Sequence, residues 1–302
     1  MLARLQQFTT LGLLLAAAAW AAYWADAGRP GWALAGALLI VFGYAIFLGL
    51  EFVLVAALHG DDPSPRPRAA QLLRAWCGEV VTAPRVFCWR QPFRSRAEPD
   101  HLPEGGAGRR GLVMVHGFVC NRGLWNPWMQ RLCAAGVPFV AVNLEPVFGS
   151  VDDYAAIIDG AVARVQAATG QPPVLVGHSM GGLAIRAWLG GPGAPARVHH
   201  VVTVGTPHRG TWLARYSHTA NGRQMRQGNP WLAGIAQREE AALLARFTCF
   251  YGHCDNIVFP ASTATLPGAD NRHVPATAHV QMLFHPEVFE AVLHRLDRGR
   301  SS

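Results

Sequence analysis

Residues 173–188 read PVLVGHSMGGLAIRAW: a short apolar run, a serine flanked by glycines, and then a run of helix-forming residues. This order predicts a strand, a sharp turn and a helix, with Ser179 at the turn. In such a turn the two backbones approach so closely that side chains at Gly177 and Gly181 would collide. The G-x-S-x-G pattern therefore predicts a strained backbone at Ser179 and a hydroxyl that projects above a sheet.

Short apolar runs and helical periods alternate regularly around this turn. They lie at residues 112–115, 124–135, 139–142, 154–168, 174–176, 183–189 and 198–204. Repeated strand-helix-strand order predicts a mostly parallel, doubly wound sheet with helices on both faces. The expected fold class is thus α/β, in a domain at residues 72–302. Residues 85–89 are expected to form an early strand, and residues 211–244 a lid insertion or an ordinary helical cap.

Two hydrophobic segments precede this domain. Residues 8–25 carry no charge, and residues 32–58 are interrupted only by Glu51. Each reaches the roughly 20 residues that cross a bilayer. Glycine and proline in residues 26–31 favour a tight turn between them, so we expect a membrane anchor at residues 1–60 that forms a transmembrane hairpin. Glu51 lies near one end of its segment, from where its carboxylate is expected to reach the polar membrane surface.

Arginines flank the hairpin unequally. Arg4 precedes the first segment, one arginine lies in the turn, and three arginines, at positions 66, 68 and 74, closely follow the second segment. This distribution favours a two-pass protein with both ends in the cytoplasm. Residues 61–71, rich in proline and arginine, form a linker to the large domain. In the alternative, the first segment is a cleaved signal peptide, and the domain is periplasmic only if the second segment does not span.

The formal net charge of +7 does not indicate nucleic-acid binding. All 26 basic residues are arginine, and seven of them lie between Arg66 and Arg96, beside a hydrophobic segment. There they suit anionic lipid at a membrane surface. No basic stripe is interleaved with aromatic residues, so no nucleic-acid partner is expected. The six cysteines include no CxxC pair and do not form a disulfide scaffold.

A serine hydroxyl needs a base, an acid that orients the base, and donors for the oxyanion. In doubly wound hydrolases the acid and then the histidine follow the serine in the chain. Asp255 directly follows the apolar run at residues 247–252 and is preferred to Asp270, because catalytic groups lie at the carboxyl ends of such strands. His279 lies in a loop from which its imidazole can reach both Asp255 and Ser179.

Two backbone amides are expected to donate hydrogen bonds to the oxyanion. Residues 112–118 read LVMVHGF, a buried strand that ends in a His-Gly pair. The amides of Phe118 and Met180 are expected to face the developing negative charge. His116 and His178 are expected to be structural.

Together these motifs resemble bacterial triacylglycerol lipases and esterases of the α/β-hydrolase superfamily. The residues that carry the resemblance are His116-Gly117-Phe118, GHSMGG at 177–182, GTPHRGT at 205–211, DNIV at 255–258, and His279. The resemblance spans residues 111–296 and implies Ser179 as nucleophile, with Asp255 and His279 as its partners. It likewise implies Phe118 and Met180 as oxyanion donors.

Hydrolysis of a lipid or other acyl ester through an acyl-enzyme is the implied activity, and it requires no metal or organic cofactor. The hydrophobic residues 8–58 add contact with a membrane, and the expected location is the bacterial inner membrane with a cytoplasmic catalytic domain. The same residues also suit an acyltransferase, in which an alcohol replaces water. A non-catalytic membrane scaffold that keeps the fold is the remaining alternative.

Overall fold

A six-stranded parallel sheet forms the centre of the computed structural model, which describes residues 1–297. In spatial order the strands are β2 (Phe139–Ala141), β1 (Leu112–Val115), β3 (Val174–His178), β4 (His200–Val204), β5 (Phe247–Tyr251) and β6 (Asp270–His273). Every neighbouring pair is parallel. The central strands β3 and β4 are buried along their whole length and are mostly apolar, because both faces of the sheet are covered. The predicted α/β fold class is confirmed.

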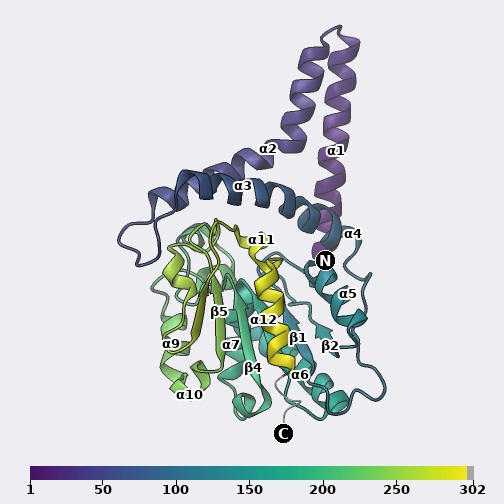
Figure 1. The fold of residues 1–302 in the computed structure, drawn as a ribbon. Helices are drawn as coiled ribbons and strands as arrows, with labels where there is room; N and C mark the ends of the chain where they lie inside the picture. The colour runs from purple at the N-terminus through teal and green to yellow at the C-terminus, as the bar shows by residue number, and fades with distance from the viewer. Residues whose placement is uncertain (298–302) are drawn as a thin grey trace.

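Helices cover both faces of the sheet (Figure 1). One face carries α6 (Ala155–Thr169) and α7 (Met180–Leu189), and the other carries α5 (Asn126–Ala134) and α12 (Pro286–Asp297). Side chains of β1 alternate between the two cores: Val113 packs with α6 and α7, whereas Met114 packs with α5 and α12. The sheet is therefore the middle layer of three.

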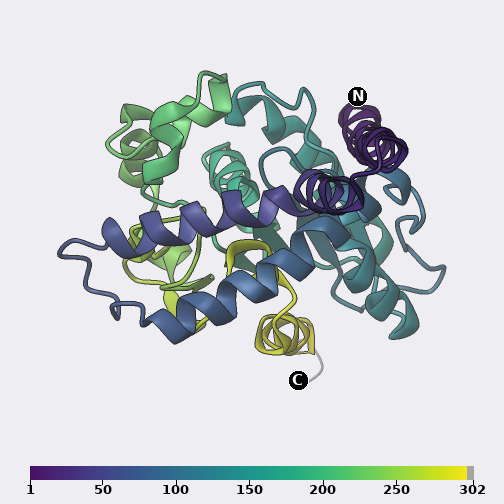
Figure 2. The ribbon, with the colours of Figure 1, turned by 90° about the horizontal axis from the view of Figure 1, so that it is seen from above.

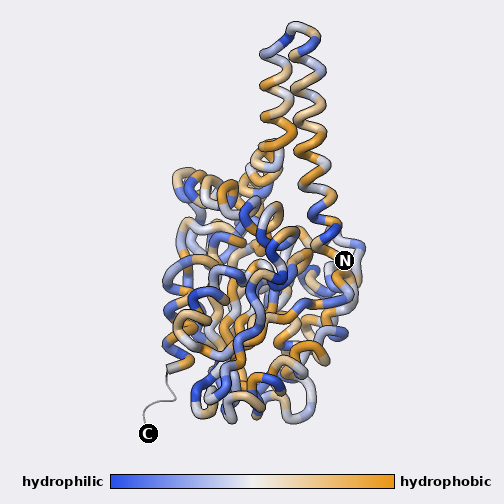
Figure 3. The backbone as a smooth tube through the Cα atoms, turned by 90° about the vertical axis from the view of Figure 1, so that its right-hand side faces the viewer, coloured by the Kyte–Doolittle hydropathy of each residue, from blue (hydrophilic) through white to orange (hydrophobic). Residues whose placement is uncertain are grey.

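The first two helices form a hairpin that projects from this domain (Figure 1). They are α1 (Leu2–Asp26) and α2 (Pro30–Ala57), and Gly28 turns the chain between them with φ of 70°. Both are long and apolar enough to cross a membrane by length and composition. Apolar residues predominate along the hairpin, and polar residues lie at its tip and base (Figure 3). The N-terminus and the sheet domain lie at the same end of the hairpin.

The C-terminal part of α2 bends away from α1 and crosses the domain, and α3 (Ala69–Pro84) runs back beside it (Figure 2). The chain then continues through a π-helical segment, η1 (Arg85–Arg90), and the short helix α4 (Gln91–Phe93). Side chains of Gln6 and Gln7 in α1 bond to Gln91 and to the carbonyl oxygen of Pro92, at 2.8 and 2.6 Å. These contacts fix the base of the hairpin to the domain.

The predicted strand at residues 85–89 is wrong, because these residues are helical. Their apolar run is too short to distinguish a strand from a buried helical turn. Here it continues α3 directly, and Val86 is fully buried in the core that contains α5 and α12. The run is apolar because it packs on that core.

Residues 211–244 are mostly helical. They contain η5 (Trp212–Tyr216), α8 (Ala220–Gln224), α9 (Pro230–Arg238) and α10 (Ala241–Leu244). Glu239 accepts two hydrogen bonds from Arg186 of α7, at 2.7 and 2.6 Å, and both side chains are buried. This paired contact ties the segment to the helix that follows β3.

Candidate active site

Ser179 occupies the tight turn between β3 and α7. Its φ of 55° and ψ of −129° are unusual for a residue with a side chain, and such strain costs on the order of 1–3 kcal/mol. A Cβ at Gly177 would lie 2.6 Å from the amide nitrogen of Gly182, and one at Gly181 would overlap the carbonyl oxygen of Val115. The predicted backbone strain and the steric need for both glycines are confirmed.

Asp255 and His279 meet at the same edge of the sheet. Asp255 follows β5, and His279 is the first residue of α11 (His279–Leu283). Nδ1 of His279 lies 3.0 and 2.9 Å from the two carboxylate oxygens of Asp255, and both side chains are buried. Oδ1 of Asp255 also accepts the backbone N–H groups of Ile257 and Val258, at 2.9 and 2.8 Å.

This pairing fixes the chemistry of the imidazole. Burial lowers the pKa of His279, but the negative charge of Asp255 and the hydrogen bond to it outweigh burial, so the pKa is raised above its ordinary value. Because an ionised carboxylate only accepts hydrogen bonds, Nδ1 carries a proton. In the neutral imidazole, Nε2 is then the nitrogen that can accept a proton.

Ser179 and His279 line one cavity. Within residues 1–297, Oγ of Ser179 makes no hydrogen bond to His279, whose Nδ1 is paired with Asp255. Hydrogen bonds between a nucleophile and its base are often long before substrate binds. Contact between Oγ of Ser179 and Nε2 of His279 therefore stays a prediction.

Two backbone amides lie next to Ser179. A Cβ at Gly117 would lie 2.7 Å from Cβ of Ser179, so the loop after β1 abuts the serine directly. In this loop, the N–H of Phe118 donates to no acceptor within the described chain. Met180 begins α7, where N–H groups point outward without helical partners. Val119, after Phe118, has φ of 52°, which is strained for a β-branched residue.

Two further histidines hold the backbone of the site. Nδ1 of His116 bonds to the carbonyl oxygen of Gly117 at 2.9 Å, and its Nε2 accepts the N–H of Leu144 at 3.0 Å. Burial lowers the pKa of His116 to about 4, so it is neutral. Nε2 of His178 lies 3.3 Å from the carbonyl oxygen of His279, and burial likewise lowers the pKa of His178.

Asp270, the other acid considered, lies elsewhere. It is the first residue of β6 and pairs in register with Thr248, near the start of β5. Its carboxylate accepts a hydrogen bond from Nε of Arg272 at 3.0 Å. Because the strands are parallel, Asp270 lies at the edge opposite the carboxyl ends that carry Asp255 and Ser179.

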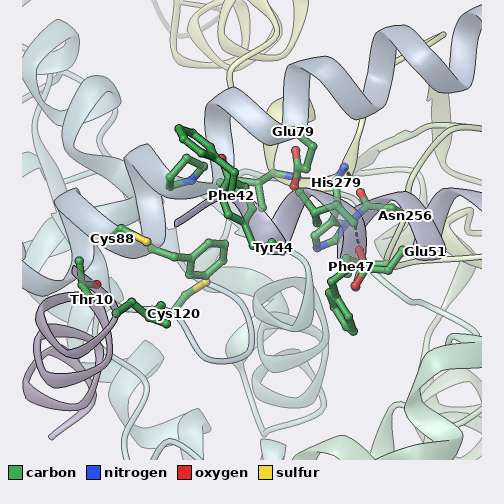
Figure 4. A pocket seen from close by; sticks show the side chains of 18 of the residues that line it. Thr10, Phe42, Tyr44, Phe47, Glu51, Glu79, Cys88, Cys120, Asn256 and His279 are labelled. Atoms are coloured by element: carbon green, nitrogen blue, oxygen red, sulfur yellow. Dashed lines mark hydrogen bonds between the residues drawn. The ribbon is translucent and has the colours of Figure 1, made fainter. Parts of the chain in front are cut away.

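The cavity that contains Ser179 and His279 has a volume of about 750 Å³. Its walls come largely from α1, α2, α3 and η1, and Figure 4 shows side chains of these helices around the cavity together with His279. Within the described chain, residues 211–244 contribute none of its lining. The segments that enclose the candidate site are therefore the N-terminal helices.

The alpha/beta hydrolase family matches residues 112–297, more than half of the 302-residue chain. The chain belongs to this family. Mature lipase BlEst2 of Bacillus licheniformis superimposes with a TM-score of 0.55 and 19% identity, over 63% of this chain and 92% of that chain. Aspergillus fumigatus lipase B superimposes with a TM-score of 0.52 and 18% identity, over 61% of this chain and 52% of that chain. At these identities the likeness concerns the fold. A comparison with curated proteins found no match.

Helices α1 to α3 lie outside this family match, yet α2 bonds to the site. Oε2 of Glu51, in α2, accepts a hydrogen bond from Nδ2 of Asn256 at 2.6 Å, and Oδ1 of Asn256 accepts the N–H of His279 at 3.2 Å (Figure 4). Glu51 is only 7% exposed. The expectation that it reaches the membrane surface is wrong, because Asn256 gives its carboxylate a buried partner.

Glu79 of α3 makes the second such contact. Its carboxylate accepts the N–H groups of Val280 and Gln281, at 3.1 and 3.0 Å, directly after His279. Burial raises the pKa of Glu79 to about 7, although these hydrogen bonds and the nearby His279 oppose the rise. Sequence reasoning missed Glu79, because a single glutamate in an amphipathic helix resembles any solvent-facing residue. Glu51 could be noticed in the sequence, because an acidic residue within an apolar segment is a candidate for a functional role.

Proposed function

We propose that this chain is a serine hydrolase that cleaves carboxylic esters. The observation that carries the proposal is the strained Ser179 in one cavity with a buried His279 that bonds to Asp255. Nε2 of His279 takes the proton of Ser179 as Oγ attacks the ester carbonyl carbon. The imidazolium then protonates the departing alcohol and leaves an acyl group on Ser179. A water molecule, deprotonated by the same imidazole, releases the acid.

The other residues of the site stabilise the steps of this reaction. Asp255 holds the tautomer of His279 and favours the imidazolium that forms during attack. The free N–H of Phe118 and the N–H of Met180 are suited to bind the oxyanion, because both lie beside Ser179. Removal of one such donor typically costs on the order of 3 kcal/mol of transition-state stabilisation.

The helical hairpin serves, in this proposal, as a membrane anchor. The N-terminus and the catalytic domain lie at the same end of the hairpin (Figure 1), and the flanking arginines favour the cytoplasm for that end. Reporter fusions at the turn between α1 and α2 and after residue 297 test this orientation. Cytoplasmic reporter activity only at the second position is expected, and the reverse pattern contradicts it.

The decisive test of the chemistry is Ser179→Ala in the full-length protein. We expect turnover of p-nitrophenyl esters to fall by about 10,000-fold or more, together with loss of fluorophosphonate labelling. Circular dichroism and thermal unfolding serve as controls, because removal of one hydroxyl leaves the fold intact. Retained turnover in a folded variant would refute the assignment of Ser179.

A further inference from the structure

The cavity has a polar end and an apolar body. Ser179, His279 and Asn256 line the polar end. Glu51 and Glu79 also line the cavity. Most of the remaining lining is apolar and comes from α1, α2, α3 and η1. Representative lining residues are Leu13, Leu14, Ile40, Phe42, Phe47 and Phe87. The volume of about 750 Å³ lies within the range of roughly 300–1,000 Å³ typical of ligand sites.

Two of the helices that wall this cavity, α1 and α2, are also long and apolar enough to cross a membrane. Leu13, Leu14 and Phe42 line the cavity, yet they are 47%, 52% and 53% exposed. Such exposure places them at its rim, where the cavity meets the outside of the hairpin. Long apolar helices exposed along most of their length mark contact with lipid. A lipid beside the hairpin therefore lies at the mouth of the cavity.

We propose that the hairpin itself forms the acyl-chain site, and that the substrate is a long-chain ester lipid that enters from the bilayer between α1 and α2. This inference rests on the proposed ester hydrolysis. A bilayer lipid has the same two parts as the cavity, a polar ester and a hydrocarbon chain. With the chain among the hairpin side chains, the ester reaches Ser179 without passage of the chain through water.

Gly43 of α2 offers a precise way to block this site. It lines the cavity, and the nearest atom to a Cβ placed there is Cδ1 of Leu39, at 4.0 Å. A larger side chain at position 43 thus occupies the cavity without a backbone clash. Gly12 of α1 is a matched control, because nothing lies within 4 Å of a Cβ there and Gly12 is not among the residues that line the cavity. Gly43→Phe and Gly12→Phe add the same apolar side chain to the same hairpin.

The experiment uses full-length protein in vesicles of ether-linked phosphatidylcholine, which contains no carboxylic ester. Its probes are 4-methylumbelliferyl palmitate and 4-methylumbelliferyl acetate, which share a leaving group and differ in chain length. We expect Gly43→Phe to reduce kcat/KM for the palmitate by about tenfold or more, and to leave the acetate within about twofold. Gly12→Phe should alter neither rate.

A second arm tests the route of entry. Palmitate ester placed in the same vesicles as the protein should be hydrolysed at least about tenfold faster than ester placed in separate, protein-free vesicles. Equal rates from the two vesicle populations, or equal loss of palmitate and acetate turnover in Gly43→Phe, would overturn the proposal. Failure of the ester hydrolysis itself is recognised separately, because the unmodified protein would then neither cleave the acetate nor react with a fluorophosphonate.

Discussion

Residues 112–297 and residues 1–93 contribute different things to one site. The first region matches the alpha/beta hydrolase family and contains Ser179, Asp255 and His279. The second lies outside the match, yet it supplies most of the apolar walls of the cavity and two buried carboxylates. The comparison suggests that the reaction belongs to the family fold, whereas substrate choice and the setting of His279 depend on the N-terminal helices. Substitutions in the two regions should therefore impair ester hydrolysis in different ways.

The largest effect is expected from a change in the family region. Asp255→Asn keeps the shape of the side chain but removes the charge that holds Nδ1 of His279 protonated. We expect kcat to fall by about 10,000-fold for acetyl and palmitoyl esters alike, because both share the same proton transfers. Steady-state kinetics with the two 4-methylumbelliferyl esters measure this. A loss confined to the longer ester would contradict the assignment of Asp255 to the chemical step.

Most of the family region, and the two apolar helices of the hairpin, could be predicted from the sequence. The spacing of Gly177, Ser179 and Gly181 requires a specific turn, and buried parallel strands give short apolar runs, so the sheet followed from local patterns. The contacts of Glu51 and Glu79 could not be predicted, because Asn256 and Val280 lie about 200 positions away in the chain. Only the fold of α2 and α3 over the sheet edge creates them.

An intermediate effect is expected from Glu79 in the N-terminal region, because its charge influences the pKa of His279. Because the pKa of His279 is raised, kcat/KM should fall tenfold per pH unit below a midpoint that lies above the ordinary histidine value of about 6.5. Ionised Glu79 contributes to that rise. Glu79→Gln removes the charge and retains an oxygen for the N–H groups of Val280 and Gln281. Its midpoint should shift to lower pH.

The control for this change is Glu79→Ala, which removes both the charge and the hydrogen bonds. It should lower kcat at the pH optimum as well as shift the midpoint, because α11 loses the acceptor for its first N–H groups. Profiles of kcat/KM for the acetyl ester between about pH 5 and pH 9 measure both effects. An unchanged midpoint in Glu79→Gln would show that Glu79 acts on folding alone.

The smallest effect is expected at residues 211–244, the segment that the sequence suggested as a lid. Nε1 of Trp231 donates to the carboxylate of Asp152, at 2.8 Å to the nearer oxygen. Trp231→Phe removes this partly exposed hydrogen bond, at a cost of about 1 kcal/mol in the free energy of unfolding. Both esters should be turned over within about twofold of the unmodified rate, because residues 211–244 supply no cavity lining within the described chain. A selective loss of palmitate hydrolysis would instead make this segment part of the acyl-chain site. The acyl-chain site would then include part of the family region as well as the N-terminal helices.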